Sequence, residues 1–450
     1  MAELQVESIL PDIENLIEDQ QDGTLLNIIS DLHPTDIEDI LYRLKSEKRK
    51  YLFHLLPANL ASEVLRELDA PVAEDVLEEA TDERITSIID EMDSDDAADV
   101  VAELPEDVQE RVLETLREEV SEEVKELLEY REDTAGGIMA LEVLSMQETA
   151  TVNETIEQIR EMHEEIDNIY NVWVTDTGGI YLGNVSLTDL VLARGNTKLS
   201  SIMEANELTI NINQDQEEVA NFFKKYDMVS APVVDDTGKL VGRITFDDIV
   251  DVIEEEGSED IARISGAPDE EIQEVSAYKI SRARIPWLLV AFVGEIFAAY
   301  IVNMFALELT QQIVIALFIP VIMAMGGASG QQASVTVVRG LATGDIDIRD
   351  TWSRLLKEFR VSIMNSFFFA SLLFIIVYLW FGLVFAIILG GSMFIIINNA
   401  TIMGSLVPMI FKRLNIDPAL AAAPLVSTSN DILGLLIYLS ITTFVLSIGL

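Results

Sequence analysis

Two kinds of acidic residue in this 450-residue chain could do chemistry, and the first is a single aspartate in an apolar segment. Asp431 follows Ser427-Thr428-Ser429-Asn430 and has no Lys or Arg nearby. A carboxylate in mid-membrane costs about 2.5–3.5 kcal/mol, so it normally faces a cavity or a partner. Mg²⁺ keeps several waters and usually takes one or two carboxylates. Asp431 is therefore a candidate ligand for a divalent cation; the alternative is an uncharged Asp bonded to a neighbouring helix.

The second kind is a dense run of acids, with eight Asp and Glu between residues 247 and 260. On a helix, Asp247, Asp251 and Glu254 or Glu255 share one face, and each like-charge pair costs roughly 0.2–0.5 kcal/mol. Bound cations would reverse that penalty. A second cluster, Asp95, Asp96 and Asp99, opens another expected helix. The alternative interpretation of both runs is a solvated helix face.

The acids are confined to one part of the chain. Residues 1–281 carry 70 Asp and Glu against 20 Lys and Arg, whereas residues 282–450 carry 8 against 9. This excess of negative charge repels nucleic acid and anionic lipid and attracts cations. Salt adaptation of the host is an alternative explanation for the same acidic composition. No Cys is present, which excludes disulfides and thiol chemistry. The start lacks the basic end and apolar run of a signal peptide, so we expect residues before 281 to remain where they are made.

The near-neutral part contains five segments long enough to cross a bilayer. They are 285–307, 313–337, 361–380, 383–411 and 419–450. Glu295 interrupts the first, and the small residues around Gly326, Gly327 and Gly330 indicate a broken second helix in which backbones approach closely. All nine Lys and Arg of residues 282–450 fall on one side of this arrangement. The chain is thus predicted to be a multi-pass cell-membrane protein with the N terminus cytoplasmic and the C terminus outside.

Short helices with a common plan repeat from about residue 25 to 130. The starts near 33, 56, 92 and 104 have a Pro, Ser or Asp before an acidic first turn and apolar residues at helical spacing. Pro34, Pro57 and Thr81 stand 23 and 24 residues apart, about two short helices. Stacked helix pairs of this kind form a superhelix.

A second repeat lies within residues 138–256, where 169–193 matches 229–252 with one gap. Each copy reads strand, turn with Gly178 or Gly238, strand, helix, and the pair resembles tandem CBS domains. Such modules often bind adenosine nucleotides through a Thr/Asp pair, which makes Thr245 and Asp248 candidate ligands for ATP as a regulatory ligand. The alternative is ordinary capping of a helix.

Superhelix, CBS pair, acidic connecting helix and five spans, in that order, resemble the MgtE family of magnesium channels. Three stretches carry the resemblance: YREDTAGGIM (130–139), FDDIVDVIEEEGSEDI (246–261) and DPALAAAPLVSTSNDILGLLIYLS (417–440). It implies an all-α superhelical domain (1–130), α/β tandem CBS domains (131–256, the copies about 138–196 and 200–256), a connecting or plug helix (257–281) and an α-helical transmembrane domain of five helices (282–450). It also implies a homodimer in the lipid bilayer, whose pore receives one copy of each residue from each chain.

The resemblance assigns roles to individual acids. Asp431 and Asp417 match the pore acids, although an N-cap explains Asp417 equally well. The regulatory metal sites map onto Glu63, Asp95, Asp99, Gly137, Asp215, Glu217, Asp227, Asp248, Asp251, Glu256, Glu259 and Asp260. Three departures bear on ion selectivity: Ala328, Thr401 and Ala423 stand where the family has Asn.

The predicted function is therefore a magnesium channel or transporter that moves the ion into the cytoplasm and is gated by cytoplasmic Mg²⁺. A broader divalent-cation transporter, for cobalt or manganese, is the first alternative. A CBS-regulated intramembrane enzyme is the second, but the three histidines are all outside the spans and no nucleophile–base pair is evident. A chloride channel needs more than five spans, and an acidic pore disfavours anions. With no Cys or His in the spans, zinc and copper are disfavoured. We expect no enzymatic activity and no nucleic-acid partner.

Overall fold

Proline, serine, threonine and acidic residues recur at short intervals in the first part of the chain. In the computed structural model, helices begin at these residues. Thr81 accepts a hydrogen bond from the Arg84 amide at 3.3 Å at the start of one helix, and Pro34 is the first residue of another. The structure describes residues 2–78, 80–162, 169–205, 208–265, 277–343, 346, 351–414, 416–421 and 424–448. These fold as two compact units, Met1–Ile253 and Glu254–Leu450.

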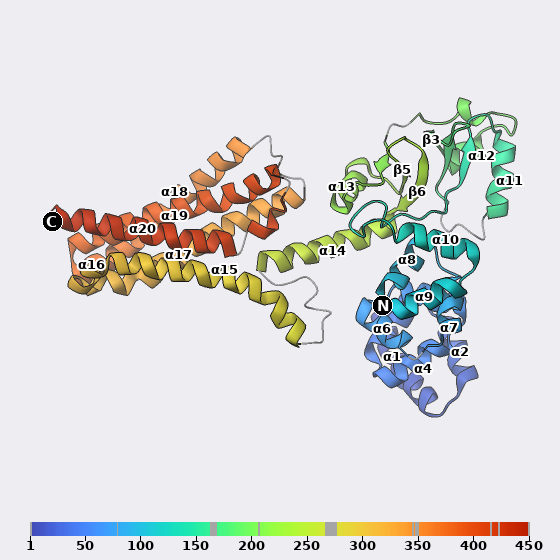
Figure 1. Cartoon of the computed structure of the whole chain (residues 1–450), viewed down its shortest axis with the longest axis horizontal. Helices are drawn as coiled ribbons and strands as arrows, with labels where there is room; N and C mark the ends of the chain where they lie inside the picture. Colours follow the sequence, from blue (N-terminus) through green and yellow to red (C-terminus); the bar gives the residue numbers. More distant parts are fainter. Residues whose placement is uncertain are drawn as a thin grey trace. The chain divides into compact units, whose positions relative to one another are not determined.

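The first unit opens with a stack of short helices, drawn in blue to teal in Figure 1. They are α1 (Ala2–Glu18), α2 (Asp22–Ile29), α3 (Pro34–Arg43), α4 (Ser46–Leu55), α5 (Ala58–Arg66), α6 (Ala70–Leu77), α7 (Asp82–Ile89), α8 (Ser94–Glu103), α9 (Glu106–Thr115) and α10 (Glu118–Leu127). Helices two apart in sequence pack together, as α3 on α5, α5 on α7 and α7 on α9. This is the stacking predicted from the repeat, and one continuous apolar core runs through it.

The α/β repeat follows, with two sheets of the same topology. The first copy has β1 (Ser145–Gln147), α11 (Val152–Met162), β2 (Asn171–Thr175), β3 (Tyr181–Ser186), α12 (Leu187–Leu192) and η1 (Leu199–Ser201). The second has β4 (Ile210–Asn211), α13 (Gln216–Tyr226), β5 (Ser230–Val234), β6 (Leu240–Thr245) and α14 (Phe246–Ser265). In each sheet the central strand pairs parallel with the first and antiparallel with the last.

The structure corrects the alignment of the two copies. The strand starts Asn171 and Ser230 are 59 residues apart, as are the positive-φ glycines Gly179 and Gly238, each with φ +84°. The repeat is therefore gapless, and Gly179 rather than Gly178 is the counterpart of Gly238. A φ in this region strongly favours glycine.

A glycine-containing turn joins the helical stack to the second sheet. The amides of Ala135 and Gly136 donate to the carbonyls of Gln214 and Ile212 at 2.7 and 2.9 Å. A Cβ at Gly136 would lie 2.8 Å from Tyr130 Cγ, and one at Gly137 would lie 2.5 Å from the Arg131 carbonyl oxygen. Backbone packing at this turn therefore requires glycine.

The second unit contains α15 (Ala277–Met304), α16 (Ala306–Gln311), α17 (Ile313–Ala342), α18 (Thr351–Phe381), α19 (Leu383–Arg413), η4 (Ala419–Ala421) and α20 (Pro424–Ser447). Among the described residues, five helices are long and apolar enough to cross a membrane: α15, α17, α18, α19 and α20. The orange and red helices of Figure 1 pack around α19, which contacts α17, α18 and α20, while α15 packs on α20.

Three predicted span details change. The first helix ends at Met304 rather than 307, and the fifth begins at Pro424 after the short η4 turn. The break predicted near Gly326 was wrong, because α17 runs unbroken through all its glycines. A continuous helix satisfies every backbone group internally, which an apolar environment demands. Close approach is nonetheless real, since a Cβ at Gly330 would lie 3.1 Å from the Ala400 carbonyl oxygen.

Candidate functional sites

Asp95, Asp96 and Asp248 form an acid cluster in the first unit, at the junction of α8 with the start of α14. Asp95 is 9% exposed, and its Oδ1 accepts a hydrogen bond from the Asp96 amide at 3.0 Å. Asp248 Oδ2 accepts from the Thr245 amide and hydroxyl at 2.9 and 2.8 Å. We call Asp95, Asp96 and Asp248 the junction acids.

The junction acids carry more negative charge than their basic neighbours offset. Burial raises the pKa of Asp95 well above its usual range, helped by Asp96 and Asp248. Burial also raises the pKa of Asp96 to about 8 against the opposing effect of Arg66, whose Nη1 lies 3.8 Å from Asp96 Oδ2. The pKa of Asp248 rises through burial, although its bonds from Thr245 pull it down. Burial therefore favours the protonated form of these acids, and a cation bound beside them would favour the ionised form instead.

Ion pairs and hydrogen bonds join the helical stack to the CBS pair around these acids. Arg243 Nη2 lies 3.6 Å from Asp93 Oδ2. Glu142 accepts from the amide and hydroxyl of Ser94 at 3.0 and 2.8 Å, and the Ser94 hydroxyl accepts from the Leu141 amide at 2.9 Å. Asp96 was predicted only as a member of an acid cluster, and Arg66, Arg243 and Glu142 were not among the predicted site residues, because their roles depend on tertiary contacts.

The other predicted regulatory residues are spread over several elements. Glu63 on α5 and Asp99 on α8 are exposed, Asp215 caps α13 by accepting from the Glu217 amide at 3.0 Å, and Asp227 ends α13 with φ +52°. Gly137 lies in the turn before the first sheet, and Asp251, Glu256, Glu259 and Asp260 follow along α14, the Asp260 side chain being outside the described part. Within the described residues, no three His, Cys, Asp or Glu side chains converge closely enough to hold a metal ion.

In the second unit, Asp417 has protein donors on both carboxylate oxygens. Oδ1 accepts from the Ala419 amide at 2.7 Å, which caps the η4 turn, and Oδ2 pairs with the Arg263 guanidinium, which also pairs with Glu259. Asp417 is thus a helix-capping residue, as one of the two interpretations of the sequence predicted. Arg263 places a protein cation at the residue predicted to bind metal.

Asp431 lies on α20 beside the Glu295 side chain of α15, close enough for a hydrogen bond between the two carboxyl groups. The preceding residue, Asn430, is 2% exposed, and neither its Oδ1 nor its Nδ2 has a hydrogen-bond partner in the described part of the chain. Asn430 faces α17, where a Cβ at Gly326 would lie 3.0 Å from its Nδ2. Buried polar groups are normally paired, so the unpaired Asn430 amide is not explained by hydrogen bonds that stabilise the fold.

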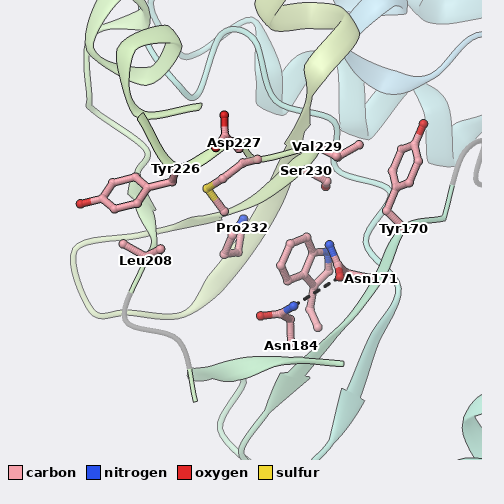
Figure 2. A pocket seen from close by; sticks show the side chains of 11 residues that line it. Tyr170, Asn171, Asn184, Leu208, Tyr226, Asp227, Val229, Ser230 and Pro232 are labelled. Carbon is pink, nitrogen blue, oxygen red and sulfur yellow. Dashed lines mark hydrogen bonds between the residues drawn. The ribbon is translucent and has the colours of Figure 1, made fainter. Parts of the chain in front are cut away.

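A cavity of about 370 Å³ opens between the two CBS copies (Figure 2). Tyr170, Asn171, Trp173 and Asn184 line it from the first copy, and residues from Tyr226 to Ser230, with Leu208 and Pro232, line it from the second. Thr245 and Asp248 do not line this cavity. Their nucleotide-binding role remains a prediction, whereas their mutual hydrogen bonds are those of a helix cap.

A helical stack and a CBS pair followed by five apolar helices indicate a multi-pass membrane protein, and comparison with known proteins identifies its class as a transporter of divalent cations. Family models match residues 319–441 (MgtE, divalent cation transporter), 32–133 (MgtE intracellular N domain) and 199–255 (CBS domain). The magnesium transporter MgtE of Thermus thermophilus is 33% identical over 98% of this chain and 99% of its own length. This chain therefore belongs to the MgtE family, a family of magnesium transporters rather than enzymes.

Two further relatives are similar over part of the chain. The magnesium transporter MgtE of Bacillus subtilis is 31% identical over 70% of each protein. The crystal structure of the cytosolic domain of the Mg²⁺ channel MgtE in complex with ATP is 32% identical, with a TM-score of 0.52 over 54% of this chain and 99% of that one.

Proposed function

We propose that this chain forms a homodimeric channel through which Mg²⁺ enters the cytoplasm down its electrochemical gradient, and that cytoplasmic Mg²⁺ closes it. The observation that carries the proposal is Asp431, an acid placed with Asn430 in the span that the divalent cation transporter model covers. On a two-fold axis the two copies of Asp431 supply the one or two carboxylates that hydrated Mg²⁺ takes.

The inward direction follows from charge and potential. The nine Lys and Arg of residues 282–450 support a cytoplasmic N terminus and an outside C terminus. A membrane potential contributes about 2.3 kcal/mol per charge per 100 mV, and a divalent ion gains about twice that on moving to the negative side. No coupled ion or nucleotide hydrolysis is then needed.

Gating is assigned to the junction acids. Without a bound cation, Asp95, Asp96 and Asp248 repel one another across the contact between α8 and α14. Mg²⁺ at this contact would offset the repulsion and hold the helical stack against the second CBS domain. The remaining predicted regulatory residues, Glu63, Asp99, Gly137, Asp215, Glu217, Asp227, Asp251, Glu256, Glu259 and Asp260, would add further sites of the same kind.

ATP is assigned to the cavity between the CBS copies. Its volume of about 370 Å³ lies within the range of small-ligand pockets. Tyr170 and Tyr226 supply aromatic faces, and Asn171 and Asn184 supply amides that could read a base. The similar cytosolic domain crystallised with ATP supports the assignment.

A broader divalent-cation specificity is the alternative. Thr401 stands where the family has Asn, and its buried hydroxyl donates to the Ile397 carbonyl at 2.9 Å, so its one donor is already used within its own helix. Ala328 on α17 also replaces Asn, and Ala423, the third departure, lies outside the described residues. Flux of Co²⁺ and Mn²⁺ close to that of Mg²⁺ would favour this alternative, and Ala328→Asn should then sharpen the discrimination.

The predicted domain bounds form part of the proposal: 1–130 and 131–256 sense the ion, 257–281 connects, and 282–450 conducts. The test is Mg²⁺ flux into liposomes with low or high Mg²⁺ on the side of the acidic domain. We expect flux that falls as that concentration rises. Flux independent of it would contradict gating, and absence of any flux would contradict transport.

A further inference from the structure

Two acids, on different helices, are the sole charged residues in the five apolar segments predicted from the sequence. Segments 285–307, 313–337, 361–380, 383–411 and 419–450 contain Glu295 and Asp431 and no other Asp, Glu, Lys or Arg. The structure brings these two side chains together, with Glu295 on α15 and Asp431 on α20. Two rare residues far apart in sequence therefore meet within one membrane domain.

The packing of α15 on α20 fixes this meeting. Gly294, which precedes Glu295, lies against the side chain of Thr428, one helical turn before Asp431, and a Cβ at Gly294 would overlap the Thr428 methyl group. The absence of a side chain lets the two helices approach closely at this point. The Glu295–Asp431 contact is thus a consequence of backbone packing rather than of flexible side chains alone.

Carboxylates in mid-membrane are unfavourable without a partner. No Lys or Arg within the five segments can offset them. Two neighbouring carboxylates repel each other when both are ionised, and a divalent cation is the ligand that offsets both charges. Glu295 is also exposed on the single chain, so its carboxylate is free to turn toward a cation beside Asp431.

A third polar group lies at the same level of α20. Asn430 is buried, and its amide oxygen and nitrogen are unpaired among the described residues. Hydrated cations are held through such oxygens as well as through carboxylates. Asn430 therefore adds an unpaired polar group next to Asp431 in sequence, with its side chain against Gly326 of α17.

We propose that Glu295 is a second carboxylate of the membrane cation site and sets how tightly that site binds and discriminates divalent ions. This inference rests on the proposed transport function and on Asp431 as the primary ligand. A functional dimer would present four carboxylates rather than two, which favours a dehydrated or tightly held ion over a loosely hydrated one.

The test is divalent flux into liposomes by full-length wild type, Glu295→Gln, Glu295→Asp and Glu308→Gln. Glu308→Gln is the matched control, because it also removes one acid but on a different helix, α16. Glu295→Gln keeps the size and hydrogen bonding of the side chain but removes its charge. We expect the Mg²⁺ concentration for half-maximal flux to rise about tenfold, as loss of a metal-site partner does, with the maximal flux within about twofold of wild type. Glu295→Asp should recover part of the affinity, and Glu308→Gln should match wild type.

The outcomes separate the inference from the function on which it rests. An unchanged half-maximal concentration in Glu295→Gln, while Asp431→Ala is inactive, overturns the role of Glu295 and leaves transport intact. Wild-type flux in Asp431→Ala overturns the pore assignment itself. Should Glu295→Gln not give a monodisperse protein in detergent, the comparison of Glu295→Asp with Glu308→Gln decides: equal half-maximal concentrations would refute the proposal.

Discussion

Asp248 on α14 lies near enough to Asp95 on α8 for its charge to raise the pKa of Asp95, although the two residues are 153 positions apart in sequence. Asp95 is 9% exposed, and burial is the main cause of its raised pKa, with smaller contributions from Asp96 and Asp248. Asp248 is further held by Thr245, which donates to it from both amide and hydroxyl. The contact between the helical stack and the second CBS domain therefore depends on what offsets these charges.

Replacing Asp95 with Asn should make the metal-free cytosolic part more stable and less sensitive to Mg²⁺. The change removes a buried charge that is repelled by Asp96 and Asp248 while keeping the side-chain volume. At a Mg²⁺ concentration 100 times the dissociation constant, one lost site removes about 2.7 kcal/mol of stabilisation. Thermal unfolding with and without Mg²⁺ measures this.

The control for that experiment is Glu83→Gln, which removes an exposed acid from α7 in the same unit. It should leave the Mg²⁺ response unchanged. An equal loss of response in both variants would mean that Mg²⁺ acts on the total charge and not on the junction.

The charge excess gives a second test, on the isolated 1–281 fragment. With 70 acids against 20 Lys and Arg it should be expanded without divalent ions and should compact when Mg²⁺ is added. Small-angle scattering and limited proteolysis near 245–265 report the change. The control is sodium at equal ionic strength, which should not compact the fragment. If sodium compacts it as well as Mg²⁺ does, charge screening alone explains the change and the acids are only a solvated surface.

Glu38 on α3 predicts a pH dependence that is separate from the metal sites. Burial, with Glu67, Asp39 and Asp69 nearby, raises its pKa to about 7. A carboxyl group whose folded pKa exceeds its unfolded value, about 4.3, destabilises the fold progressively as pH rises from about 4 through 7. Glu38→Gln should therefore raise the melting temperature at pH 8 and have no such effect at pH 4. A gain of equal size at both values would contradict the assignment.

Nucleotide binding can be assigned to one of two places by substitution. Tyr170 lines the cavity between the CBS copies, whereas Thr245 caps α14. Stacking of a base on an aromatic ring is worth about 1–3 kcal/mol, so Tyr170→Ala should weaken ATP binding roughly 5- to 150-fold by calorimetry. Thr245→Ala should leave it unchanged. The reverse pattern would place the nucleotide at Thr245 and Asp248, as the sequence motif indicates.

Local features of the fold were predictable because they depend on local chemistry. Hydropathy located the five apolar helices, and the glycine-marked repeat located both sheets, since each signal is complete within one segment. The alignment gap around Gly178 was wrong because composition alone cannot tell which of two adjacent glycines takes φ +84°. The helix break expected at Gly326 was wrong, because the glycines of α17 allow neighbouring helices to pack closely and do not end the helix.

Contacts between distant elements could not be predicted in the same way. Asp431 stands out in the sequence, but its contact with Glu295 depends on how Gly294 packs against Thr428. The guanidinium of Arg263 at Asp417 and the burial of Asp95 likewise depend on tertiary structure. Family resemblance supplies the acids, whereas only the structure shows which of them share a neighbour.

The central claim is that Asp431 binds the transported ion, and the most direct measurement is Mg²⁺ flux into liposomes by wild type and Asp431→Ala. Both proteins must first elute as the same folded species in detergent. The account predicts Mg²⁺ flux in wild type that saturates with concentration, and loss of that flux in the variant, because the pore site loses a carboxylate from each subunit at once. Wild-type flux through Asp431→Ala would contradict it.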